Sequence, residues 1–193
     1  MIAYALGNKL YLNITNRCTN KCSFCIRNQG PGVGGYYLWL DEEPTTQEVI
    51  EAIGDPSEYE EVVFCGYGEP LLRIHTVLEV AKYVKGFNVP VRIDTNGQAN
   101  LAHGENIVPE LEGLVDTISI SLNAENSAKY DQICSSEFGE EAFEALLEFT
   151  RECKKYIPNV ILSVVDIPEI DVEKCRAIAE DLGVDFRVRA YIK

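Results

Sequence analysis

Short apolar runs alternate with amphipathic stretches along most of this chain. Runs of strand length and composition cover residues 10–15, 61–65, 89–97, 117–122, 159–165 and 184–191. One strand-plus-helix unit recurs about every 30 residues, which is the size of a βαβ unit. Strands connected in this way lie parallel, with helices covering the sheet. The pattern therefore predicts a parallel sheet with helices on its outside.

Apolar residues recur at helical spacing between the predicted strands. Thr45 and Glu48 form a capping-box pattern before the first helix, and Gly54 ends it. Gly86 ends a second helix, and Asp171 caps the last one. After the first helix, the pattern predicts helices at residues 74–85, 105–111, 127–133, 140–156 and 172–182.

The number of these units indicates an incomplete barrel. A full barrel of eight units needs about 250 residues, whereas this chain has 193 residues and six predicted units. We therefore expect an α/β fold, a partial (β/α)6 TIM-like barrel of parallel strands that is open on one side, as one domain over residues 1–193. In such folds the chemistry lies at the carboxyl ends of the strands.

Composition narrows the classes of function. Asp and Glu number 31 against 17 Lys and Arg, so the net charge is −14. Such a surface repels phosphate backbones and argues against general nucleic-acid binding. No apolar run reaches the roughly 20 residues of a membrane span, and the first residues do not resemble a signal peptide. We therefore expect a cytoplasmic protein without membrane association.

Cys18, Cys22 and Cys25 follow the first predicted strand with the spacing C-x3-C-x2-C. Thiolates suit iron–sulfur clusters and zinc. A structural zinc site needs four ligands, whereas three cysteines suit a four-iron cluster that leaves one iron open. The remaining cysteines show no second ligand spacing. We interpret them as small buried side chains rather than an auxiliary cluster: Cys65, Cys134, Cys153 and Cys175.

Polar motifs end three further predicted strands. Residues 66–70 read GYGEP, residues 94–97 read DTNG, and residues 121–123 read SLN. The glycines of the first motif let the backbone approach a ligand closely, and Glu69 adds a carboxylate. Tight turns and a solvated strand end explain the same motifs without a ligand. Their shared position at the carboxyl ends of strands, beside the cysteine loop, favours a ligand site.

The cysteine triplet followed by GYGEP resembles the radical SAM superfamily. The resemblance implies that Cys18, Cys22 and Cys25 hold a [4Fe–4S] cluster, and that S-adenosylmethionine binds the open iron through its amino and carboxylate groups. The short length and the sequence YLNITNRCTNKCSFC are similar to those of small TatD-associated radical SAM proteins. Residues 94–97 resemble the glycyl-radical-enzyme activases, with Ser121 at the position of a second aspartate of their cation site.

The resemblance also implies which residues hold S-adenosylmethionine. The turn around Glu69 is expected to hold the amino group, and Phe24 and the backbone near Val165 to contact adenine. Arg189 is expected to point into the site, either as a partner for Glu69 or as a substrate contact. The full expected set is Phe24, Gly66, Tyr67, Gly68, Glu69, Asp94, Thr95, Asn96, Ser119, Ser121, Asn123, Val165 and Arg189.

The implied activity is radical chemistry of oxidoreductase or lyase type. The reduced cluster cleaves S-adenosylmethionine to a 5′-deoxyadenosyl radical, which takes a hydrogen atom from a substrate that the sequence does not identify. We expect a peptide or protein substrate, because a large partner would close the open barrel, and a reductant such as flavodoxin or ferredoxin. The alternatives are a glycyl-radical-enzyme activase and a non-catalytic metal or iron–sulfur protein.

Overall fold

Seven strands form one sheet in the order β1-β2-β3-β4-β5-β6-β7. The computed structural model describes residues 1–30 and 32–191, so residue 31 of the glycine-rich loop and residues 192–193 of the expected domain lie outside it. β1 pairs antiparallel with β2, and each later pair is parallel. The strands are β1 (Ala3–Leu6), β2 (Lys9–Leu12), β3 (Glu61–Phe64), β4 (Val91–Thr95), β5 (Thr117–Ser121), β6 (Asn159–Val165) and β7 (Asp185–Arg189).

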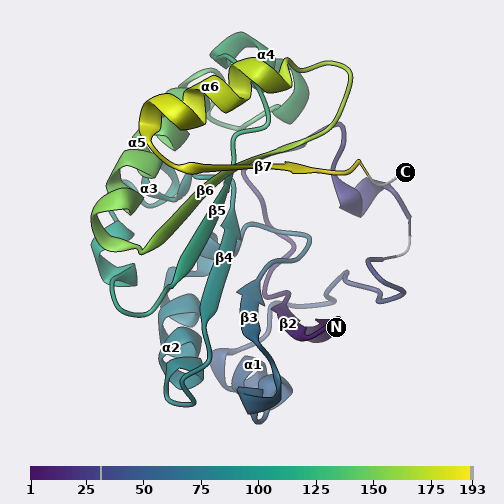
Figure 1. Ribbon diagram of the computed structural model, residues 1–193. Coiled ribbons are helices and arrows are strands. Elements are labelled where there is room, and N and C mark those ends of the chain that lie inside the picture. Colours follow the sequence, from purple (N-terminus) through teal and green to yellow (C-terminus); the bar gives the residue numbers. More distant parts are fainter. Residues whose placement is uncertain (31, 192–193) are drawn as a thin grey trace.

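The helices lie along the outer side of the curved sheet, and the opposite side is left open (Figure 1). They are α1 (Thr46–Ile53), α2 (Ile74–Lys85), α3 (Ala99–His103), α4 (Ser127–Cys134), α5 (Glu141–Tyr156) and α6 (Val172–Leu182). Because β1 and β7 are the two edges of the sheet, the barrel is not closed. The expected open α/β fold is confirmed. In the described part of the chain, no helix has the length and apolar character needed to cross a membrane.

The two faces of the sheet differ in polarity. Side chains alternate between the faces along each strand, and those facing the helices, such as Ile93, Ile118 and Ile120, are fully buried. Their neighbours on the inner face include Asp94 and Ser121, which line a cavity. The helix-facing layer is therefore the apolar core, and the inner face is left for polar chemistry.

Two predictions about the elements are wrong. The described part of the chain has seven strands rather than six, because residues 3–6 pair back onto β2 through the two-residue turn Gly7–Asn8. Gly-Asn between two apolar runs is a hairpin signal that the strand count overlooked. The helix expected at residues 105–111 is a short 3-10 turn, Val108–Leu111, since Pro109 cannot donate a helical hydrogen bond. The helix α3 was not predicted.

Asn13 joins three segments just beyond the end of β2. Its fully buried side chain donates hydrogen bonds to Met1 O at 3.1 Å and to Leu38 O at 2.6 Å. The side-chain oxygen accepts a hydrogen bond from Tyr67 N at 3.1 Å. One amide thus fixes the hairpin, the segment around Leu38 and the turn after β3.

Replacing Asn13 with alanine should lower the free energy of unfolding by about 3 kcal/mol, because it leaves buried polar groups of the backbone without partners. Urea denaturation measures this change. The control is Asn8→Ala in the exposed hairpin turn, which should change stability by less than about 0.5 kcal/mol. Equal effects of the two substitutions would show that the buried amide does not hold these segments together.

Candidate active site

The cysteine loop is anchored to the end of a helix. Lys21 N donates to Cys134 O at 2.8 Å and Ser23 N donates to Ile133 O at 2.9 Å, so the loop satisfies carbonyl groups that the end of α4 leaves free. The thiols on this loop are free and partly exposed: Cys18, Cys22 and Cys25. The loop therefore presents three sulfurs from a backbone that is held in place.

A buried network of amide and hydroxyl side chains also holds the cysteine loop. Gln98 donates to Asn20 Oδ1 at 2.9 Å and to Tyr130 OH at 2.8 Å, and Asn20 Nδ2 donates to the same hydroxyl at 2.9 Å. Thr19 Oγ1 donates to Gln98 Oε1 at 2.7 Å and accepts from Asn96 Nδ2 at 2.8 Å. A network whose polar groups are satisfied holds one geometry, so the residues between the cysteines are fixed by long-range contacts.

The GYGEP turn packs directly on the cysteine loop. A Cβ atom on Gly68 would lie 2.4 Å from Thr15 O and 2.5 Å from Arg17 O, and one on Gly66 would lie 2.1 Å from Asn13 Oδ1. Neither position accepts a side chain without movement of its neighbours. The two glycines thus allow the turn to approach the loop, which is a structural reason for their presence beside any role toward a ligand.

Glu69 connects the GYGEP turn to the end of β4. Its carboxylate accepts hydrogen bonds from Leu71 N at 3.0 Å, Thr95 Oγ1 at 2.8 Å and Asn96 N at 2.7 Å, and its own amide donates to Arg17 O at 2.7 Å. Burial raises the pKa of Glu69 to about 7, and these hydrogen bonds oppose the rise. The carboxyl group therefore changes its charge near neutral pH.

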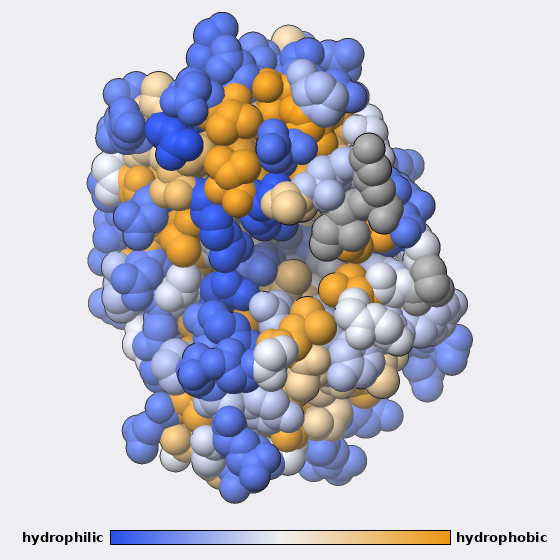
Figure 2. All heavy atoms as spheres, turned by 45° about the vertical axis from the view of Figure 1, so that its right-hand side comes forward, coloured by the Kyte–Doolittle hydropathy of each residue, from blue (hydrophilic) through white to orange (hydrophobic). Residues whose placement is uncertain are grey.

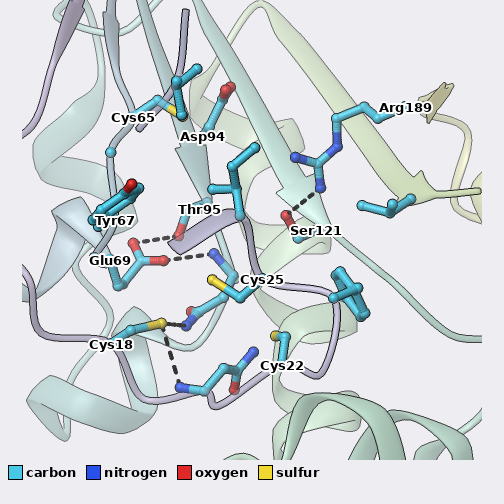
Figure 3. Close-up of a pocket in the computed structure, with 18 of the residues that line it drawn as sticks. Cys18, Cys22, Cys25, Cys65, Tyr67, Glu69, Asp94, Thr95, Ser121 and Arg189 are labelled. Carbon is cyan, nitrogen blue, oxygen red and sulfur yellow. Dashed lines mark hydrogen bonds between the residues drawn. The ribbon is translucent and has the colours of Figure 1, made fainter. Parts of the chain in front are cut away.

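The loop, the turn and the strand ends enclose one cavity of about 340 Å³. Figure 2 shows it as a hollow whose rim carries both hydrophobic and hydrophilic side chains. In Figure 3 the three thiols of the cysteine loop and Glu69 lie on one side of it, and Arg189 and Ser121 on the other. Twelve of the thirteen residues expected to hold the nucleoside line the cavity, together with the three cysteines: Phe24, Gly66, Tyr67, Gly68, Glu69, Asp94, Thr95, Asn96, Ser121, Asn123, Val165 and Arg189.

One expected residue lies outside the cavity, and one of the two roles expected of Arg189 is not seen. Ser119 does not line the cavity, because it lies two residues deeper on β5, where its hydroxyl accepts a hydrogen bond from Arg187 at 3.4 Å. Arg189 does not pair with Glu69. Its Nη2 donates to Ser121 Oγ at 3.2 Å instead.

Sequence reasoning missed several residues of the site. Cys65 was read as a small buried side chain, but it lines the cavity, as does Tyr191. Asn13 and Gln98 were also missed, although a polar residue inside the apolar run LYLNIT signals a buried hydrogen bond. The other scattered cysteines are fully buried, as expected: Cys134, Cys153 and Cys175.

The donor set suits a cluster bound by thiolates. Burial raises the pKa of Cys18 to about 12, and the pKa of Cys25 is raised for the same reason. The pKa of Cys22 is raised by contact with the Cys134 thiol and by burial. Such thiols are protonated at neutral pH until a metal displaces the proton, so loading should release protons.

The described residues contain no group of three or more His, Cys, Asp or Glu side chains arranged to hold a single metal ion. In an iron–sulfur cluster, by contrast, the cysteines can bind separate irons, so they need only face a common space. Polar atoms around the cavity also lack partners among the described residues, namely Tyr67 OH and Asn123 Oδ1. The cavity thus offers soft ligands and free polar groups, which fit a cluster with a polar organic ligand.

The profile of the Radical SAM superfamily matches residues 12–182. This chain belongs to the radical SAM superfamily. A curated protein of Methanocaldococcus jannaschii, MJ1227, whose name provisionally describes it as a glycyl-radical enzyme activating enzyme, is 29% identical over 166 residues. The match covers 84% of this chain, which spans 64% of the length of that relative.

Solved structures of low identity share the fold. Streptococcus suis SuiB bound to its precursor peptide SuiA matches with a TM-score of 0.72 at 14% identity, over 98% of this chain and 40% of that chain. Methylornithine synthase (PylB) matches with a TM-score of 0.62 at 15% identity, over 95% of this chain and 53% of that chain. At such identity the likeness shows the architecture alone, which for this radical SAM chain is the open barrel.

The pKa of Glu69 predicts a stability that depends on pH. The folded chain keeps this proton up to about pH 7, whereas an exposed glutamate loses it near 4.5. The proton on Glu69 therefore makes its full contribution to the free energy of unfolding below about pH 4.5. This contribution, about 3 kcal/mol in total, is lost as the pH rises through about 7.

Urea denaturation of the metal-free wild type and of Glu69→Gln, between about pH 5 and pH 8, isolates this group because the other titrations cancel in the difference. The difference in unfolding free energy, wild type minus variant, should fall as the pH rises. A difference that stays constant would show that Glu69 ionises as an exposed carboxyl group does.

Proposed function

We propose that this chain is a radical SAM enzyme whose Cys18, Cys22 and Cys25 hold a [4Fe–4S] cluster with one iron open for S-adenosylmethionine. The observation that supports it most is the convergence of three free thiols, the Glu69 turn and the ends of β4 and β5 on one cavity. Its volume of about 340 Å³ lies within the range of small-molecule sites, roughly 300–1,000 Å³.

When bound and reduced, the cluster would supply one electron that splits S-adenosylmethionine into methionine and a 5′-deoxyadenosyl radical able to take a hydrogen atom from a substrate. The protein residues position the ligand and exclude water. Glu69, held by Thr95 and by the Asn96 amide, presents negative charge to the ammonium group. Because its pKa lies at about 7 without a ligand, a bound cation would favour the ionised form.

The other side of the cavity suits the nucleoside. Phe24 and Val165 offer apolar surface for a purine, and Ser121 and Asn123 offer polar groups for the ribose hydroxyls. Asn123 has a backbone φ of 59° and a buried Oδ1 atom without a partner among the described residues. A strained, polar residue beside a cavity is an expected feature of a ligand site.

We propose a peptide or protein as the hydrogen donor. The sheet has two edges, and two large apolar side chains next to cavity-lining residues are exposed. Trp39, at 37% exposure, contacts the ring of Tyr67, and Tyr37, at 60% exposure, precedes Leu38. A partner that covers this side would exclude water from the radical. The cytoplasmic location and an electron donor such as flavodoxin or ferredoxin belong to the same proposal.

A second candidate function is activation of a glycyl-radical enzyme. The 29% identity to MJ1227, over 84% of this chain, favours it. The two candidates separate in one assay, since an activase leaves a stable glycyl radical on its partner enzyme, which electron paramagnetic resonance detects. Rapid turnover of a small metabolite by the isolated protein would contradict both.

Anaerobic reconstitution should give about four irons per chain and release of 5′-deoxyadenosine from S-adenosylmethionine in the presence of dithionite. Replacing any one of Cys18, Cys22 and Cys25 with alanine should lower this release at least about 100-fold, because the cluster loses a ligand. Iron analysis and chromatographic measurement of the nucleoside check both expectations.

The matched control is Cys175→Ala, which removes a buried thiol from α6, outside the cavity. This variant should keep the iron content and the nucleoside release of the wild type. Unchanged release from the loop variants, or one zinc per chain with no release, would contradict the proposed function and support a structural metal site.

A further inference from the structure

Two arginines lie on the inner face of β7. Arg187 and Arg189 are two residues apart, so their side chains leave the same face of the strand. Both reach across β6 to β5, where Arg187 donates to Ser119 and Arg189 donates to Ser121. Arg189 lines the cavity (Figure 3), and Arg187 lies deeper.

A third arginine on the inner face differs in its electrostatic surroundings. Arg92 Nε lies 3.4 Å from Asp94 Oδ1 and 3.6 Å from Glu61 Oε2, so its charge is balanced by carboxylates. Lys9 also pairs with Glu61, at 2.8 Å. Glu61 and Asp94 are thus already engaged with Arg92 and Lys9.

Arg187 and Arg189 have no such partner. Among residues 1–30 and 32–191, no carboxylate lies within ion-pair distance of either guanidinium. The Nε atoms of all three inner-face arginines are buried without a hydrogen-bond partner, but of the three only Arg92 has carboxylates beside it. The side chains of Arg187 and Arg189 are both partly buried, and partial burial of a cation without a counter-charge costs free energy. Two arginines without a carboxylate partner are unusual in this chain, because it has 31 acidic residues and only 17 basic ones.

We infer that Arg189, with Arg187 behind it, forms a subsite for a carboxylate group of the substrate. This inference rests on the proposed function, in which the methionine carboxylate binds the cluster held by Cys18, Cys22 and Cys25. Figure 3 shows these thiols on another side of the cavity from Arg189. A guanidinium presents paired N–H groups that match the two oxygens of a carboxylate. A phosphate dianion fits less well, because Asp94 and Glu69 line the same cavity and would repel its second charge.

The substrate class follows from this chemistry. The hydrogen donor would present an acidic side chain or a free carboxyl terminus to β7, and the hydrogen to be removed would lie nearer the centre of the cavity. The serines at the ends of the two arginines keep the guanidiniums extended across β6 without neutralising them. This arrangement leaves the positive charges for the ligand.

The test uses reconstituted protein saturated with S-adenosylmethionine and a matched pair of probes, N-acetylglycine and N-acetylglycine amide, which differ in one negative charge. Isothermal titration calorimetry should show that the wild type binds the acid at least about tenfold more tightly than the amide. Arg189→Gln should abolish this preference, and Arg189→Lys should retain part of it, which also shows that loss of binding in the first variant is not misfolding.

The control is Arg151→Gln, which removes the same charge from the exposed face of α5 and should keep the preference. Equal binding of the two probes to the wild type, or an unchanged preference in Arg189→Gln, would overturn the inference. A third result would also overturn the inference: Arg189→Gln weakens binding of S-adenosylmethionine about tenfold, and S-adenosylmethionine prevents binding of N-acetylglycine. Arg189 would then bind the carboxylate of the methionine moiety rather than that of a substrate.

Failure of this subsite and failure of the proposed function give different results. Release of 5′-deoxyadenosine without selective binding of N-acetylglycine would remove the subsite and leave the radical SAM enzyme in place. Selective binding of N-acetylglycine without release of the nucleoside would support the carboxylate subsite and contradict the proposed activity.

Discussion

The site depends on the close contact between the turn after β3 and the cysteine loop after β2. The backbone of Gly68 lies so near the carbonyls of Thr15 and Arg17 that no side chain fits between them. The next residue, Glu69, bonds through its amide to the loop and through its carboxylate to the end of β4. Three consecutive parallel strands are therefore locked together at their carboxyl ends, where the thiols lie.

The division of the sheet into two faces makes this site possible. Helices supply the apolar contacts on the outer face, so the inner face is free to carry carboxylates, guanidiniums and hydroxyls. Polar groups placed in a partly dry cavity keep strong electrostatic interactions. The raised pKa of Glu69 and the unbalanced charges of Arg187 and Arg189 both follow from that setting.

The parts of this structure that local sequence encodes were predictable. The cysteine triplet, the GYGEP turn and the alternation of strands and helices each occupy a short stretch, and they predicted the family, the open barrel and most of the cavity lining. Asn13 and the network of Gln98, Asn20 and Tyr130 were missed, because their partners lie far away in the sequence. Side-chain pairing across strands was missed for the same reason, so Arg189 was not connected to Ser121.

The most direct test of an open iron beside Glu69 is electron paramagnetic resonance of the reduced, reconstituted protein with and without S-adenosylmethionine. If the ligand binds the cluster, its addition should change the g-values of the reduced cluster, while the amount of reduced iron stays the same. A spectrum that S-adenosylmethionine leaves unaltered, at concentrations that calorimetry shows to be saturating, would contradict binding at the iron.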